Sequence, residues 1–85
     1  MLDVREQAEW DAGHLADAIL LPLSQIRQGV DQSQLDADKI IYCYCHSGFR
    51  VRQAADILAP LGYDVRPLRW GYSELLRAGF KKSAR

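Results

Sequence analysis

The sequence is poor in the residues that mark several classes of protein. Its 85 residues include two cysteines, three prolines and six glycines, too few for a disulfide scaffold or for a collagen-like or disordered chain. The formal net charge is zero, so no overall basic field would hold nucleic acid or an anionic membrane. Apolar runs such as residues 18–21 are far shorter than a membrane span. We therefore expect neither nucleic acid nor a membrane as a partner.

What is present is the composition of one small globular domain. Hydrophobic residues make up 48% of the chain and charged residues 26%, which is sufficient for a packed core. The chain opens with Met1, Leu2 and Asp3 and shows no basic segment followed by an apolar one, as a secretory signal would. We expect a single, monomeric domain over residues 1–85 in the reducing cytoplasm, either as a minimal protein or as a piece of a longer one.

Apolar patterning predicts strands that alternate with helices. The expected strands are residues 2–5, 18–21, 39–45 and 64–68, and the expected helices are residues 6–12, 23–30, 51–61 and 72–78. Residues 39–45 are almost entirely apolar, which favours a strand covered on both faces. Pro67 predicts a sheet edge or a strand end. The alternation indicates an α/β fold with a mostly parallel sheet and helices on both faces.

Both cysteines lie in the stretch YCYCHSGFR, residues 42–50. Two residues apart on a strand, their Cβ atoms would be roughly 6.5–7 Å apart, whereas a disulfide needs about 3.5–4.5 Å. A metal site would require Cys43, Cys45, His46 and His14 to converge, and no paired ligand spacing supports one. We expect no metal, and we interpret Cys43 as a buried core residue.

Cys45 stands where its strand is predicted to end, at the edge where parallel α/β sheets form ligand crevices. The loop from Cys45 to a helix beginning near Arg50 contains His46, Ser47, Gly48 and Phe49. Such a loop can turn successive N–H groups inward, and with the helix N-terminus it makes an anion site that favours a thiolate. From the residues alone, Cys45 is either a nucleophile or a structural thiol, and Arg50 is either an anion contact or a surface residue.

Charge is distributed unevenly along the chain. Residues 1–45 carry three basic and eight acidic side chains, whereas residues 46–85 carry eight basic and three acidic ones. Positive charge gathered around Cys45 would favour an anion; solvated helix faces are the alternative. Asp3 and Arg5 follow the first strand toward the same sheet edge. One interpretation is that they pair with each other or cap a helix; the alternative is that Arg5 adds positive charge to the rim of the pocket.

Three motifs occur in an informative order: Asp-Val-Arg-Glu at residues 3–6, Gly-His-Leu at residues 13–15 and Cys-x-x-Gly-x-Arg at residues 45–50. Together they resemble the rhodanese-like (sulfurtransferase homology) domain family. The resemblance implies a rhodanese-like sheet of about four to five strands, with a chain that begins inside its first strand, and no metal or organic cofactor. It also implies that Cys45 carries sulfane sulfur as a persulfide and that residues 46–50 bind the sulfur and its anionic donor.

We therefore expect a thiosulfate sulfurtransferase-like enzyme that takes sulfur from a small anionic donor such as thiosulfate and passes it to cyanide, a thiol or a protein acceptor. His46 is expected to support the thiolate, and Trp70 to cover part of the pocket mouth. One alternative is a non-catalytic binding or regulatory module. Another is a cysteine-dependent phosphatase or arsenate reductase, but those phosphatases place five residues between Cys and Arg, whereas four separate Cys45 from Arg50. The tighter ring suits a terminal sulfur better than a phosphoryl group.

Overall fold

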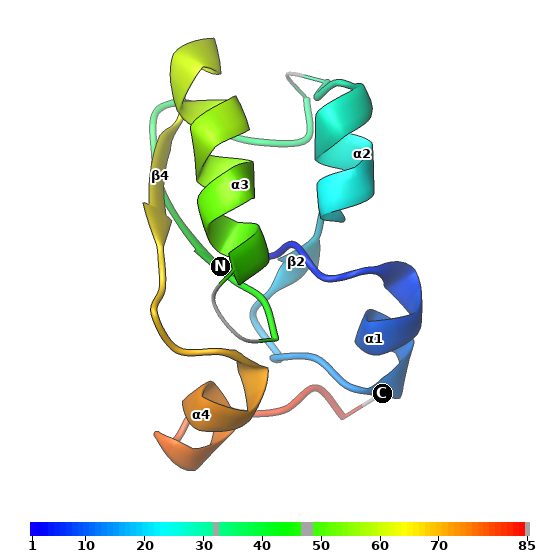
Figure 1. Cartoon of the computed structure of the whole chain (residues 1–85). Coiled ribbons are helices and arrows are strands. Elements are labelled where there is room, and N and C mark those ends of the chain that lie inside the picture. Colours follow the sequence, from blue (N-terminus) through cyan, green and yellow to red (C-terminus); the bar gives the residue numbers. More distant parts are fainter. Residues whose placement is uncertain (32, 47–48, 85) are drawn as a thin grey trace.

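A computed structural model describes residues 1–31, 33–46 and 49–84. The elements in chain order are β1 (Leu2–Asp3), α1 (Gln7–Ala12), β2 (Ile19–Leu20), α2 (Leu23–Gln28), β3 (Ile40–Tyr44), α3 (Phe49–Leu58), the 3₁₀ turn η1 (Ala59–Leu61), β4 (Asp64–Pro67) and α4 (Tyr72–Arg77). These strands form one parallel sheet in the order β2-β1-β3-β4 (Figure 1). The predicted α/β fold is confirmed. The described residues contain no helix that is long and apolar enough to cross a membrane.

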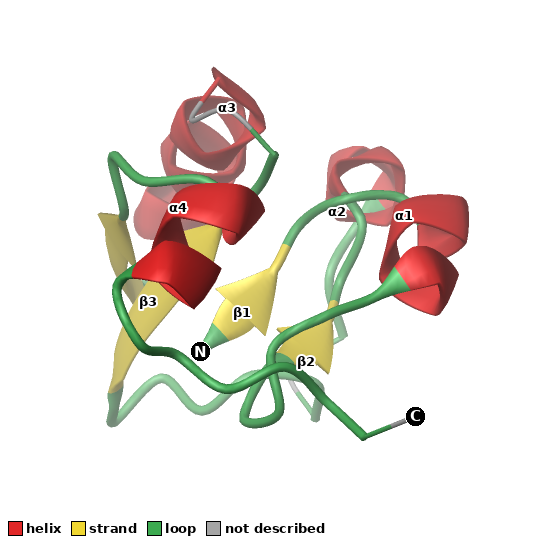
Figure 2. Ribbon diagram, turned by 90° about the horizontal axis from the view of Figure 1, so that it is seen from below, coloured by secondary structure: helices red, strands yellow, loops and turns green. Residues whose placement is uncertain are grey.

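Helices α2 and α3 lie on one side of the sheet (Figure 2) and bury its larger core. The apolar stripe of α3 predicted from the sequence is the face that packs inward, since Val51, Ala54 and Leu58 are all buried. Burial of such a stripe supplies most of the stability of a short helix. The core on this side consists of Leu2, Val4, Leu21, Leu23, Ile26, Leu35, Ile41, Cys43, Cys45, Val51, Ala54, Leu58 and Tyr63.

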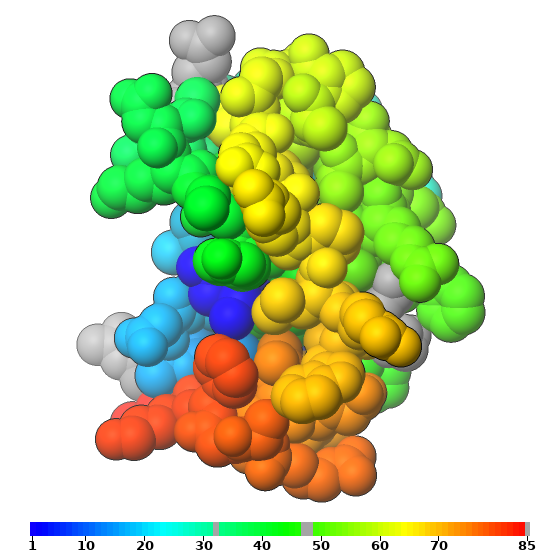
Figure 3. Space-filling view, turned by 90° about the vertical axis from the view of Figure 1, so that its left-hand side faces the viewer, coloured from blue at the N-terminus to red at the C-terminus, as the bar shows by residue number. Residues whose placement is uncertain are grey.

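Among the described residues, the opposite face of the sheet is covered near the C-terminal ends of the strands. There Leu75 of α4 packs with Leu15 against Tyr44, the last residue of β3. At the start of β3, Ile40 is 49% exposed and Tyr42 45% exposed, and this part of the strand reaches the surface beside β4 (Figure 3). The expectation that the whole strand is covered on both faces is therefore wrong for its first half, because no helix packs there among the described residues.

The sequence predicts only one of the two edge strands correctly. Pro67 ends β4, which lies at a sheet edge as predicted. The apolar run at residues 18–21 favours a buried strand, and this expectation is wrong: β2 is also an edge strand, Ile19 is 54% exposed, and within the run only Leu21, just beyond β2, is fully buried. A short apolar run does not by itself distinguish an edge strand from a central one.

A buried ion pair fixes the end of β1. The guanidinium of Arg5 donates to both carboxylate oxygens of Asp3 at 2.8–3.1 Å, and Nη2 also donates to the carbonyl of Gly13 at 2.7 Å. The Arg5 and Asp3 side chains are 4% and 0% exposed. The guanidinium also lies over the ring of Tyr72, 4.3 Å from its centroid, and such cation–π contacts gain strength when they are desolvated. One side chain thus joins β1, the end of α1 and the start of α4.

We predict that Asp3→Ala lowers the free energy of unfolding by about 3 kcal/mol or more, because it leaves the Arg5 charge buried without its partner. Urea unfolding followed by tryptophan fluorescence measures the loss. The matched control is Asp64→Ala, which breaks an Asp–Arg pair of the same spacing, Asp64–Arg66, on the exposed surface; that variant should unfold close to wild type. Equal losses in the two variants would contradict the structural importance of the buried pair.

Candidate active site

Cys45 directly follows β3, at the C-terminal edge of the sheet, as the sequence predicts. Its backbone carbonyl accepts a hydrogen bond from the N–H of Tyr72 at 2.9 Å, which ties it to the start of α4. The residue is 1% exposed, so a reactant must reach the sulfur beneath the residues around it. Neither cysteine forms a disulfide. The structure therefore places Cys45 at the expected edge, but in a more enclosed position than an open surface thiol.

Cys43 lies one strand position deeper and is 0% exposed within the larger core. The prediction that it is a core residue is confirmed. Burial, with a smaller contribution from the charge of Cys45, raises the pKa of the Cys43 thiol to about 12. Almost no Cys43 thiolate exists near neutral pH, so this sulfur is unsuited to nucleophilic chemistry.

The loop after Cys45 is only partly described. His46 is exposed, and Phe49, the first residue of α3, is 73% exposed. Ser47 and Gly48 lie outside the described residues, so the cradle of N–H groups expected for residues 46–50 stays a prediction. Trp70 is 52% exposed and precedes Gly71, which packs against this loop.

Arg50 is held by an acidic residue that the sequence analysis did not single out. Its Nη1 and Nη2 atoms donate to the two carboxylate oxygens of Glu9 at 2.5 and 2.8 Å. The hydrogen bonds from Arg50 lower the pKa of Glu9 to about 2, so the carboxylate stays ionised at ordinary pH. The pKa of Arg50 is raised, first by Glu9 and also by the negative charge of Cys45. Arg50, in the first turn of the helix that follows Cys45, thus already binds a carboxylate.

Arg5 does not lie on the rim of the pocket, and that expectation is corrected. Its side chain is buried, and its guanidinium is occupied by Asp3 and the Gly13 carbonyl. The alternative that Asp3 and Arg5 pair with each other is the one that the structure shows. His14 has a structural role: its ring nitrogen contacts the carbonyl of Trp10 at 3.0 Å, and its own carbonyl accepts the N–H of Ser83.

Two residues that shape the site, Glu9 and Gly71, could not be predicted from the sequence because their roles depend on contacts between distant segments. Glu9 meets Arg50 across 41 positions of the chain, and no local pattern links them. Gly71 is required by space rather than by backbone conformation, since its φ is −84°. A Cβ atom there would overlap the carbonyl of His46 and lie 3.2 Å from the carbonyl oxygen of Cys45.

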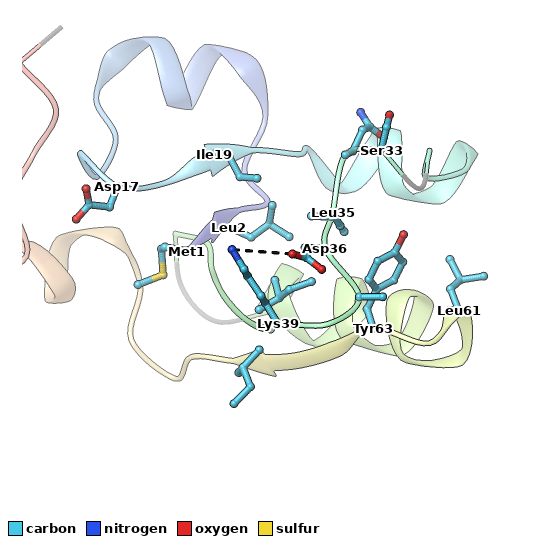
Figure 4. Close-up of a pocket in the computed structure, with 14 residues that line it drawn as sticks. Met1, Leu2, Asp17, Ile19, Ser33, Leu35, Asp36, Lys39, Leu61 and Tyr63 are labelled. Atoms are coloured by element: carbon cyan, nitrogen blue, oxygen red, sulfur yellow. Dashed lines mark ion pairs between the residues drawn. The ribbon is translucent and has the colours of Figure 1, made fainter.

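A hollow of about 790 Å³ lies at the other edge of the sheet, where the strands begin (Figure 4). Its walls include Met1, Leu2, Leu61 and Tyr63, and the Lys39–Asp36 ion pair spans part of it at 3.9 Å. Neither cysteine lines it. Within the described part of the chain, no group of His, Cys, Asp or Glu side chains could hold a metal ion.

A parallel α/β sheet with a cysteine at its C-terminal edge, followed at once by a loop and a helix, defines the class of this domain. The family model that describes the rhodanese-like domain matches residues 1–78. The chain belongs to the rhodanese-like domain family.

Individual relatives agree with this assignment. The chain is 34% identical to Uncharacterized protein YqhL of Bacillus subtilis over 96% of this chain and 58% of YqhL. It is 35% identical to a protein of Allochromatium vinosum named Sulfurtransferase, over 93% of this chain and 73% of that one. A crystal structure of a rhodanese-related protein from Thermoplasma volcanium superimposes with a TM-score of 0.84 at 28% identity, covering 99% of this chain and 82% of the other. The chain thus spans little more than half the length of YqhL.

We predict that Cys43 resists alkylation in the folded protein. In a Cys45→Ala variant at pH 8, iodoacetamide should leave Cys43 unmodified, because its raised pKa and its burial keep the thiolate scarce and inaccessible. The same variant in concentrated urea should be modified completely. Intact mass spectrometry reads both samples. Alkylation of the folded variant at the rate of the unfolded one would contradict the burial of Cys43.

We predict that Gly71→Ala destabilises the protein by about 2 kcal/mol, because the new methyl group meets backbone rather than a movable side chain. Because Gly71 has an ordinary backbone conformation, the loss would come from the contact and not from strain in φ. Thermal unfolding measures the effect, with Ser73→Ala, an exposed position in α4, as the control. A Gly71→Ala protein as stable as the control would show that His46 can move away without cost.

Proposed function

We propose that this domain is a sulfurtransferase that carries sulfane sulfur as a persulfide on Cys45. The observation that carries the proposal is the place of Cys45, at the C-terminal edge of the sheet and four residues before α3, whose first turn contains Arg50. The Allochromatium vinosum relative named Sulfurtransferase supports the same general activity. A small anionic donor such as thiosulfate and a thiol, cyanide or protein acceptor are the partners that this chemistry requires.

The proposed cycle has two balanced steps. The Cys45 thiolate attacks the outer sulfur of the donor; the new S–S bond forms while the sulfur–sulfur bond of the donor breaks, and its electron pair leaves with sulfite when the donor is thiosulfate. The terminal persulfide sulfur is then attacked by cyanide or a thiolate, and Cys45 departs as the thiolate. Splitting the transfer in this way is covalent catalysis of the ping-pong kind.

The surroundings of Cys45 suit a reaction in which negative charge moves between sulfur atoms. α3, a helix of ten residues, begins four residues after Cys45, and the N-terminus of a helix favours a nearby anion. Cys43 stays protonated, so it does not compete as a nucleophile. Because the cycle needs a reduced Cys45, it fits the reducing cytoplasm proposed for this chain.

The burial of Cys45 favours one alternative, a binding or regulatory module that keeps the fold without turnover. A 1% exposed sulfur would react with small donors only if the structure opens around it or if the donor enters a narrow path. The two functions differ in whether Cys45 gains sulfur, which can be measured directly.

We predict that incubation with thiosulfate adds one sulfur atom to the wild-type protein, detected by intact mass, and that Cys45→Ser abolishes both this adduct and any release of sulfite. Cys43→Ser is the matched control: it should keep the adduct and lose some stability, because it places a hydroxyl in the core. Full turnover by Cys45→Ser would end the proposal. A wild-type protein that takes up no sulfur from any donor would favour the binding module.

A further inference from the structure

The ion pair between Glu9 and Arg50 is built into the fold. Glu9 Oε1 accepts the backbone N–H of Glu6 at 3.1 Å in addition to the hydrogen bond from Arg50. This carboxylate therefore closes the first turn of α1 and binds Arg50 at the same time. The other end of α1 is fixed by the hydrogen bond from Arg5 to the carbonyl of Gly13. Glu9 is thus oriented from both ends of its helix before any substrate arrives.

Arg50 already has a bidentate anionic partner. Each terminal nitrogen of its guanidinium faces one oxygen of Glu9, the two-pronged arrangement that matches a carboxylate best. Both side chains are about one-third exposed, so a solute can approach them. A donor anion that binds Arg50 must compete with a carboxylate held in place.

The second arginine near this edge is neutralised in the same way, because Arg5 is paired with Asp3 in the interior. Arg50 therefore contributes almost no net charge to the site once its own partner, Glu9, is counted. A dianion depends more on net positive charge than a monoanion does, since its attraction to each cation is twice as large. The pairing should weigh most heavily against donors that carry two charges.

We propose that Glu9 is a specificity-determining residue that disfavours dianionic sulfur donors, such as thiosulfate, and favours donors with a single negative charge. The inference rests on the proposed sulfurtransferase function and concerns the same site. The two donor classes react in parallel ways. Thiosulfate loses sulfite as the Cys45 persulfide forms, and an alkyl thiosulfonate anion loses the alkyl sulfinate instead, with the same S–S bond made and the same kind of S–S bond broken.

The test compares the rates at which the two donors load sulfur onto Cys45, in wild type and in Glu9→Gln. The glutamine keeps an oxygen for the N–H of Glu6, so the helix cap is retained while the negative charge is removed. Releasing one positive charge should raise the loading rate for thiosulfate over that for methanethiosulfonate by roughly fivefold, the effect of one unit charge at contact in water. Intact mass against time gives both second-order rate constants.

The matched control is Asp11→Asn, which removes the same charge from an exposed position of α1, where Asp11 bonds Gln7 and not Arg50. It should leave the ratio of the two rates as in wild type. In a double variant with Arg50→Gln, the effect of Glu9→Gln should disappear, because the charge it releases is gone. Circular dichroism confirms that the variants are folded.

The outcomes separate the two proposals. If wild type loads sulfur from both donors but Glu9→Gln changes their ratio no more than Asp11→Asn does, the role of Glu9 is refuted and the sulfurtransferase function stands. The role of Glu9 is equally refuted if the effect persists without Arg50. If Cys45 gains sulfur from neither donor, both proposals are overturned. A shift of the ratio that requires Arg50 supports the assignment, because a purely structural defect would slow both donors together.

Discussion

The buried pair of Asp3 and Arg5 is the interaction on which the rest of the structure depends. Arg5 reaches from the end of β1 to the carbonyl of Gly13, after α1, and to the ring of Tyr72, at the start of α4. Isolated burial of either charge would be costly, and only their bidentate contact makes both tolerable. In a sheet whose first two strands are only two residues long each, this polar cluster supplies order that backbone pairing alone would not.

The two segments that contact the candidate site, the start of α4 and helix α1, are both held by that cluster. The N–H of Tyr72 binds the carbonyl of Cys45, and the preceding Gly71 packs against His46. On the other side, none of the residues of α1 is buried. Polar contacts therefore hold this helix in place and position Glu9 beside Arg50. Arg5 thus contacts both the segment that binds Cys45, at Tyr72, and the end of the helix that carries Glu9.

Charge near Cys45 is organised as pairs and not as a surplus of cations. Asp3 satisfies Arg5, and Glu9 satisfies Arg50, although the second half of the chain is rich in basic residues. A site of this kind gains order from its ion pairs and gives up part of the long-range attraction that an unpaired arginine would exert on an anion. Under the proposed sulfurtransferase function, this balance would bear on which sulfur donors react with Cys45.

Local patterns in the sequence were sufficient for the helices, for the strands to within a few residues, for the parallel α/β class, for Cys43 in the core and for Cys45 at the end of its strand. Those features follow from apolar periodicity, from turn residues and from the reach of a strand, all of which act over a few residues. Three features were decided only by the tertiary structure: the burial of Arg5, the meeting of Glu9 with Arg50 and the close approach of Gly71 to His46. Each depends on which distant segments lie side by side once the sheet has packed. The periodicity of the sequence does not predict which charged side chains on separate elements will pair.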